Sequence, residues 1–306
     1  FGSPMSDNNR RQAHLPEDSI PIETPVGTAP AFIVEDERGT IITLPGVPRE
    51  LYYLMEKAVL PYLLQRLGRR DVLVTRILRT VAIGESQIDQ AIADLEASSN
   101  PTVGLSAHPG QTDVRIVAKA ATEAEAEELV ADFEGRIRER LGATIYATGA
   151  ATLEAVLAEL LAEREASLAV AETLTQGDLS RRLARHPEVF RGGVVAADGP
   201  RLAQLLGLDG EGMTGEPGAI ALAHAIRRGW GADYGLAVVT DEEDAPWVAV
   251  ARGPDDGVEV RRLRFRGRDR RAITWTTTLS LEFLRRLLLG LAKGWAGYPV
   301  GPEERR

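Results

Sequence analysis

Hydroxyl and carboxyl side chains gather directly after an apolar run near the middle of the chain. The run Leu168 to Ala171 predicts a buried strand, and a helix is expected to begin at Glu172-Thr173. Nucleophilic catalysis needs an activated nucleophile, a proton donor for the leaving group and hydrogen-bond donors for the negative charge that develops. Thr173 could act as the nucleophile, with Glu172 and Thr175 beside it as supporting groups. The structural alternative is that the two threonine hydroxyls cap the helix.

A second group of polar residues follows Thr240, where four carboxylates, Asp241 to Asp244, come in succession. Each would repel a phosphate group by ~1 kcal/mol or more at a few ångströms and a high effective dielectric. The four lack the alternating spacing and the glycine of a calcium loop, so a solvated acidic turn is favoured over a metal site. The 4 histidines of the chain are scattered, so neither a metal nor a cofactor is expected.

Two turns in this region resemble the C-terminal domain of the CinA family (competence/damage-inducible protein A), which is linked to nicotinamide-nucleotide amidase activity. The family reads A-E-S-C-T-G-G at the first turn, and residues 171–177 read AETLTQG. At the second turn the family reads G-V-V-A-Y-S-N-E-A-K, and residues 193–202 read GVVAADGPRL. The resemblance implies a three-layer α/β amidase-like domain over residues 150–293 and a nucleotide-like small molecule as its ligand.

Most of the reactive side chains of the family are replaced at these turns. The family serine is Thr173 here, the cysteine is Leu174 and the first glycine is Gln176. The family tyrosine and lysine fall on Ala197 and Leu202. Arg201, which precedes Leu202, cannot act as a base because a guanidinium stays protonated. The third family loop, T-G-I-A-G-P, has become the acidic run.

We therefore predict a CinA-like protein whose nicotinamide mononucleotide deamidase site is inactive, and which serves as a binding or assembly module, as a homodimer. The residues expected at the ligand are those retained at the three loops: Glu172, Thr175, Gly177, Gly193 and Thr240. The alternative is an active amidohydrolase on nicotinamide mononucleotide or another amide, with Thr173 as its nucleophile.

Residues 1–69 resemble the second half of the molybdopterin-binding-like (MoaB/MogA-type) α/β domain that begins CinA proteins. The landmarks are NRRQA at 9–13, PVGTAP at 25–30 and LPGVPRE at 44–50. Residues 1–5 could be a tag remnant, whereas residues 5–16 resemble family sequence. The T-G-G-L-G-P-T-x-D-D motif of the upstream half is missing, so we expect either a fragment or a chain that has lost this half. The metal-dependent cleavage of ADP-ribose that the family implies is then expected to be absent.

Local patterns predict the elements of the first two domains. A hairpin of residues 31–34 and 41–44 precedes a helix over 50–67 that Pro61 interrupts. Residues 70–149 resemble the KH-like α+β middle domain of CinA proteins. Their predicted β-α-β-β-α elements lie at 72–81, 84–95, 103–106, 114–118 and 122–141. An RNA-binding KH domain needs a Gly-x-x-Gly loop, which is missing here, so this domain is interpreted as structural or as an interface.

Residues 150–293 alternate strands and helices in the manner of an α/β domain. Besides the opening strand, we predict strands at 193–197, 234–239, 248–251 and 258–265, helices at 153–164, 218–228 and from 271, and turns at 198–199 and 253–257. Seven arginines between 261 and 271 could meet nucleic acid or an acidic partner. Their alternation with Leu263 and Phe265 favours a half-buried strand instead. Residues 294–306 are expected to form a loose tail.

Composition limits the class of protein. A length of 306 residues suggests two or three domains, and 44% hydrophobic with 26% charged residues is typical of globular proteins. The net charge of -9 argues against a general nucleic-acid binder. The absence of cysteine excludes disulfides and thiolate zinc sites and fits a cytoplasmic location. No apolar run approaches the ~20 residues that span a bilayer, so no membrane partner is expected.

Overall fold

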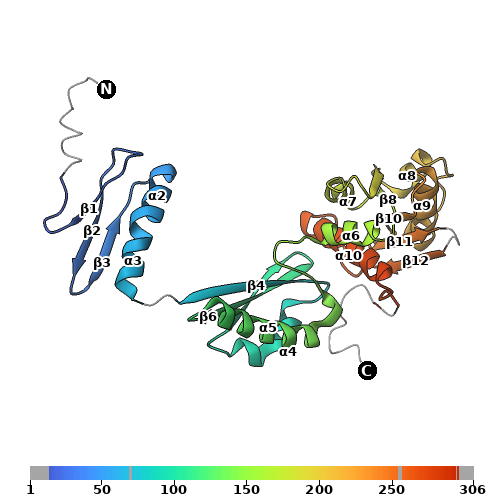
Figure 1. The fold of residues 1–306 in the computed structure, drawn as a ribbon. Coiled ribbons are helices and arrows are strands. Elements are labelled where there is room, and N and C mark those ends of the chain that lie inside the picture. Colours follow the sequence, from blue (N-terminus) through green and yellow to red (C-terminus); the bar gives the residue numbers. More distant parts are fainter. Residues whose placement is uncertain (1–13, 69–70, 254–256, 294, 296–306) are drawn as a thin grey trace, which may run out of the picture. The chain divides into compact units, whose positions relative to one another are not determined.

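The computed structural model describes residues 14–68, 71–253, 257–293 and 295. The chain divides into two compact units, Phe1–Asp71 and Val72–Arg306 (Figure 1). Three features predicted above fall wholly or partly outside the described residues. They are the NRRQA landmark at 9–13, the middle of the turn at 253–257 and nearly all of the tail at 294–306.

The first unit is a three-stranded antiparallel sheet with one helical segment. Its strands are β1 (Ile20–Ile22), β2 (Ala31–Asp36) and β3 (Gly39–Thr43), in that order across the sheet, followed by α2 (Pro48–Leu54), a π-helical turn (Met55–Val59) and α3 (Leu60–Leu67). The predicted hairpin and helix are confirmed, whereas β1 was missed because three residues carry too little pattern. Pro61 lies in the first turn of α3, where a missing N–H is tolerated, and the π turn directly precedes it.

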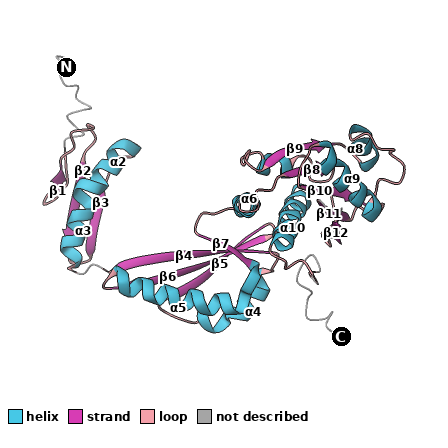
Figure 2. Ribbon diagram, turned by 45° about the vertical axis from the view of Figure 1, so that its right-hand side comes forward, coloured by secondary structure: helices cyan, strands magenta, loops and turns pink. Residues whose placement is uncertain are grey.

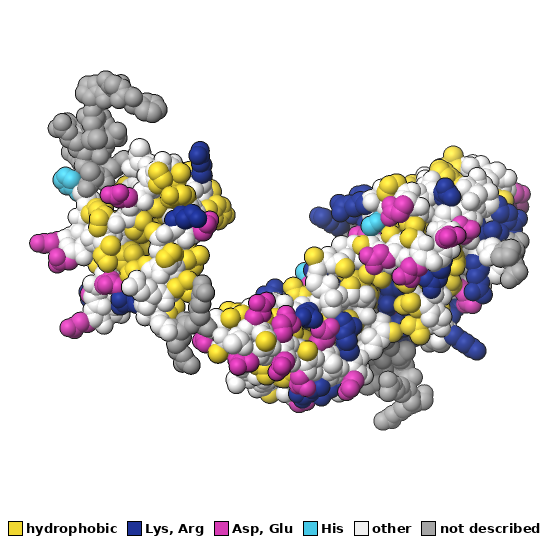
Figure 3. Space-filling model, viewed as in Figure 1, with side chains coloured by type: hydrophobic (Ala, Val, Ile, Leu, Met, Phe, Trp, Pro, Cys, Tyr) yellow, Lys and Arg dark blue, Asp and Glu magenta, His cyan; other side chains and the backbone are white. Residues whose placement is uncertain are grey.

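Apolar side chains lie at the surface of this first unit as well as in its interior (Figure 3). Several large apolar side chains of the hairpin and the helical segment are exposed, among them Ile41, Tyr52 and Leu67. Ala31, Ile33, Leu54 and Val59 are buried. A single small sheet and one helix bury little apolar surface, which is the weakness expected of such a piece.

The second unit begins with a four-stranded antiparallel sheet in the order β5-β6-β4-β7, covered by two helices. The elements are β4 (Val72–Val81), α4 (Glu85–Glu96), β5 (Thr102–His108), β6 (Gln111–Ala120), α5 (Glu123–Leu141) and β7 (Ile145–Thr148). Ile88, Ile92 and Leu95 of α4 are buried, as are Phe133 and Ile137 of α5. Thr122 caps α5 by accepting a hydrogen bond from the Glu125 amide at 3.3 Å. The strand β7 was missed.

The rest of the second unit is built on a mixed sheet in the order β12-β11-β10-β8-β9 (Figure 2). Its strands are β8 (Leu168–Glu172), β9 (Phe190–Val195), β10 (Tyr234–Thr240), β11 (Pro246–Arg252) and β12 (Gly257–Arg262). Strand β8 lies between β9 and β10 and is parallel to both, while β11 and β12 are antiparallel additions. This arrangement confirms the predicted α/β class.

Helices cover both faces of this sheet and make three layers. One face carries α6 (Leu153–Ala162), α7 (Asp178–Leu183) and α10 (Arg270–Leu288), and the other carries α8 (Gly199–Leu205) and α9 (Gly215–Gly229). Strand residues alternate between the faces, with valine and leucine toward the first and mostly alanine toward the second. The small side chains let α9 come close to the sheet: a Cβ on Gly235 would overlap with the carbonyl oxygen of Ala223.

Several local predictions in this domain were wrong. The helix expected at Glu172-Thr173 begins only at Asp178, after a tight turn, and the turn expected at Asp198-Gly199 is the capped start of α8. The basic strand ends at Arg262, so Leu263 and Phe265 lie in the loop that follows it. Within the described parts of the chain, no helix is both long enough and apolar enough to span a membrane.

Candidate functional site

The candidate site lies where the chain changes direction across the large sheet. From β8 the chain passes through α7 to β9 on one side, and it then returns through α8 and α9 to β10 on the other side. Parallel strands that diverge in this way leave a crevice at their carboxyl ends, which is where open α/β sheets bind ligands. Thr173, Ala196 and Thr240 stand at or just beyond the ends of β8, β9 and β10.

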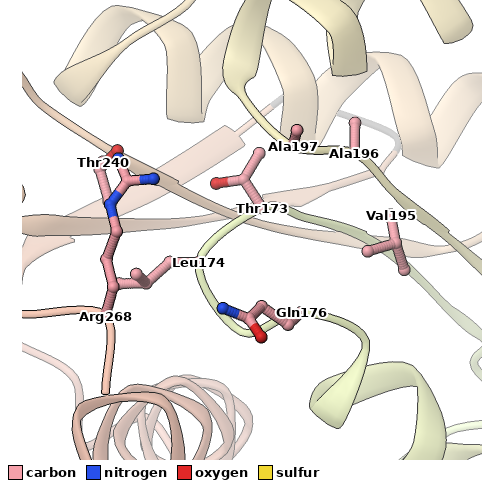
Figure 4. A pocket seen from close by; sticks show the side chains of 8 residues that line it. All are labelled: Thr173, Leu174, Gln176, Val195, Ala196, Ala197, Thr240 and Arg268. Carbon is pink, nitrogen blue, oxygen red and sulfur yellow. The ribbon is translucent and has the colours of Figure 1, made fainter. Parts of the chain in front are cut away.

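A pocket of about 460 Å³ occupies this crevice, a volume within the usual range for small-molecule sites. It is lined by Thr173, Leu174, Gln176, Val195, Ala196, Ala197, Thr240 and Arg268. Figure 4 shows the hydroxyl of Thr173 and the guanidinium of Arg268 pointing toward one another across it. Leu174 is buried in the wall and Gln176 is exposed, so the larger side chains that replace the family's small residues leave the pocket open.

The turn that carries Thr173 is organised by the buried carboxylate of Glu172. Glu172 is 0% exposed and accepts five hydrogen bonds. Its donors are the Thr175 hydroxyl (2.6 Å), the Gly177 amide (3.1 Å), the Leu179 amide (3.3 Å), the Ser180 amide (2.9 Å) and the Ser180 hydroxyl (2.6 Å). The carboxylate therefore satisfies the amides at the start of α7, which would otherwise be available to an external anion.

This arrangement explains why the helix starts later than expected. Gln176 and Gly177 have φ angles of 51° and 89°, in the left-handed region, so the chain cannot continue as a right-handed helix from Thr173. The hydroxyl of Thr175 donates to Glu172, and that of Thr173 donates to the Val238 carbonyl at 3.3 Å. Neither threonine caps the helix, so that alternative is wrong.

The predicted site residues divide into two groups in the structure. Thr173 and Thr240 line the pocket. Glu172 and Thr175 are fully buried and bonded to each other within the turn. Gly177 is the N-cap of α7, and a Cβ on Gly193 would overlap with the Ser180 hydroxyl, which marks close packing of β9 on α7. Glu172, Thr175, Gly177 and Gly193 thus hold the turn in place.

The acidic run after β10 forms a solvent-exposed turn, as expected, and its carboxylates also pair with arginines. Three of its four carboxylates pair with arginines at the end of β12 and in the loop after it: Asp241 with Arg262 (2.9 Å), Glu243 with Arg262 and Arg266 (3.1 Å each), and Asp244 with Arg268 (2.8 Å). The two charged runs are therefore partners of each other. The predicted repulsion of a phosphate assumed that these carboxylates have no partners. Because three of them pair with arginines, that repulsion is weakened.

Asp241 is the most strongly held of these carboxylates. Partial burial opposes its ionisation, but hydrogen bonds from the Ala245 amide, the Trp247 indole and Arg262 outweigh this effect and lower the pKa of Asp241 to about 2. The Trp247 side chain is thereby turned onto the loop and does not line the pocket.

Arg268 is the pocket residue that sequence reasoning missed. It lay within the run of arginines, where no single residue stood out. The signal that could have found it is charge complementarity between residues 241–244 and 262–268, but which arginine reaches the pocket depends on the path of the loop. In the described residues, no group of three or more His, Asp or Glu side chains is placed to hold a metal ion.

Comparison with known proteins agrees with this architecture. Residues 75–147 match the family model for the damage-inducible protein CinA KH domain, and residues 150–288 match the model for the CinA C-terminal domain. A CinA-like protein of Frankia casuarinae is 38% identical over 310 residues, with 95% of this chain and 71% of that protein covered. A putative competence-damage inducible protein of Moorella thermoacetica is 36% identical over 297 residues, with 92% and 72% covered.

Solved structures similar to the chain include competence-damaged protein (CinA) superfamily proteins. One from Klebsiella pneumoniae is 20% identical with a TM-score of 0.41, and the matched region covers 45% of this chain and 96% of that protein. Another, from Enterobacter cloacae, is 21% identical with a TM-score of 0.40, and the matched region covers 48% of this chain and 96% of that protein. On the sequence relatives and the two domain models, the chain belongs to the CinA family of competence/damage-inducible proteins.

Proposed function

We propose that the C-terminal domain of this CinA-family protein binds a small nucleotide-like ligand in the pocket at Thr173 without hydrolysing an amide. The observation that carries the proposal is the chemistry of the lining. Its polar side chains are two hydroxyls, one carboxamide and one guanidinium, from Thr173, Thr240, Gln176 and Arg268. Such groups can recognise phosphate, ribose or amide oxygens, because all of them can donate hydrogen bonds.

The same lining argues against catalysis by Thr173. A threonine hydroxyl needs a general base to remove its proton before it attacks an amide. None of the described residues that line the pocket is a histidine, lysine or carboxylate. The hydroxyl of Thr173 donates to a peptide carbonyl, which is not a base, and the adjacent carboxylate of Glu172 is engaged by five donors. The proposal is therefore a ligand-binding module.

Two measurements on the purified chain test this function. Calorimetric titration with nicotinamide mononucleotide is expected to show binding, and incubation with the same compound is expected to release no ammonia above a protein-free control. Ammonia release at ordinary enzyme rates that disappears in Thr173→Ala would favour the alternative, an active amidohydrolase with Thr173 as its nucleophile. Thr173→Ser is the matched variant, because it retains the hydroxyl and removes the β-branch.

We further propose that the protein acts as a homodimer. Large apolar side chains are exposed on the C-terminal domain, among them Leu205 (64%) and Trp230 (42%). Burial of such side chains between two copies would remove apolar surface from water. Light scattering of the eluting protein over a range of concentrations measures the assembly, and a mass that stays at one chain throughout contradicts the dimer.

A further inference from the structure

One ion pair stands at the edge of the pocket and involves a residue of its lining. The Nε and Nη2 atoms of Arg268 both donate to Oδ1 of Asp244, at 3.0 and 2.8 Å. Arg268 is the lining residue that carries a formal charge. The guanidinium that an anionic ligand would need is therefore already bound to a carboxylate of the chain itself.

We propose that Asp244 and Arg268 form a latch that lowers the affinity of the pocket for anionic ligands. The inference rests on the proposed binding function and concerns the control of the same site. The pair occupies two of the five N–H donors of Arg268 and neutralises its charge, so an anionic group entering the pocket must compete with the Asp244 carboxylate for the guanidinium. Asp244 thus acts as an internal competitor and sets how much negative charge a ligand must bring to displace it.

The backbone around Asp244 fixes the carboxylate in place. Asp244 has a φ angle of 57°, in the left-handed region that few non-glycine residues adopt. Its amide donates to the Asp241 carbonyl at 3.2 Å, and the Asp241 carboxylate accepts from the Glu243 amide at 3.0 Å and the Ala245 amide at 2.9 Å. Because this turn is closed by its own hydrogen bonds, the long side chain of Arg268 is the part free to move.

The exposure of the pair makes it weak enough to open. The side chains of Arg268 and Asp244 are 61% and 51% exposed. Ion pairs of this kind contribute little net free energy, since water and salt screen them. Removal of the competing carboxylate is therefore expected to tighten the binding of an anion by about two- to five-fold.

The test is a double-mutant cycle on the full chain, with nicotinamide mononucleotide as the probe in calorimetry. Asp244→Asn removes the charge and keeps a residue that tolerates the left-handed conformation, so the turn is retained. The Kd is expected to fall about two- to five-fold in Asp244→Asn and to rise in Arg268→Gln. In the Arg268→Gln background, Asp244→Asn is expected to have no further effect, because no guanidinium remains to be released.

Glu242→Gln is the matched control, because it removes the same charge from the same loop. A latch leaves the Kd of Glu242→Gln near that of wild type. The latch is overturned if Glu242→Gln tightens binding as much as Asp244→Asn, or if Asp244→Asn acts equally in the Arg268→Gln background. Either result would mean that the loop acts only through its general negative charge.

A second measurement needs no ligand and separates the latch from the binding function. Phenylglyoxal modifies accessible arginines, and mass mapping gives the rate at Arg268. That rate is expected to rise at least two-fold in Asp244→Asn and to stay unchanged in Glu242→Gln. If no variant binds nicotinamide mononucleotide, the proposed function fails, and an unchanged rate at Arg268 in Asp244→Asn overturns the latch independently.

Discussion

Replacement of Glu172 by glutamine is a demanding test of the proposed site architecture. The carboxylate accepts from three backbone amides and two hydroxyls, and it is fully buried. A glutamine must direct its NH₂ group toward one set of these donors. The less costly orientation places the glutamine NH₂ group at Ser180. The Ser180 hydroxyl can rotate and accept a hydrogen bond from this NH₂ group. The Ser180 backbone amide cannot do so and is left without an acceptor.

The cost follows from this geometry. One buried amide without an acceptor costs about 1–3 kcal/mol, and the remaining hydrogen bonds lose the strength that a charged acceptor gives them. We therefore expect Glu172→Gln to lower the free energy of unfolding by about 2–4 kcal/mol. For a unit of this size the melting temperature should fall by roughly 5–15 °C.

Urea denaturation followed by circular dichroism measures this loss, with an unchanged m value as the sign that the transition remains two-state. Glu163→Gln is the matched control, because the Glu163 side chain is 70% exposed and its loss should change stability by less than about 0.5 kcal/mol. Thr175→Val removes a single donor and should cost about 1 kcal/mol. A Glu172→Gln protein as stable as the Glu163→Gln protein would refute the role assigned to the buried carboxylate.

Three further predictions concern other parts of the second unit. Gly199→Ala should cost about 1–3 kcal/mol in urea denaturation, because its Cβ would overlap with the Met213 carbonyl, whereas Gly229→Ala meets open space and should be neutral. Asp241→Asn should be less stable than wild type above about pH 4, and the difference should vanish as the pH falls toward 2, since the folded state holds the pKa of this carboxyl at about 2 against an ordinary 3.8. A difference that grows on acidification would contradict this. Glu282→Gln should cost about 3–5 kcal/mol by thermal melting, because it leaves the buried arginines beside it unpaired.

Much of the fold could be predicted because it depends on local patterns. Periodicity and side-chain chemistry within a few residues are enough to predict three kinds of feature. These are a helix face (Ile88, Ile92 and Leu95), a helix cap (Thr122) and a buried strand (from Leu168). Short elements such as β1, β7 and α8 were missed, because three to seven residues carry too little pattern to separate them from turns. The family was recognisable from loop motifs for the same local reason.

The candidate site shows where local reasoning ends. The chain alone was enough to identify the loops that meet at the crevice and to show that the reactive side chains of the family are replaced there. It could not reveal that Glu172 occupies the helix start, that the acidic and basic runs neutralise each other, or that Arg268 reaches the pocket. Each of these features is a contact between side chains that the packing of the sheet and its loops brings together. The energy of an interaction between two charges depends on their separation, and the sequence does not give that separation.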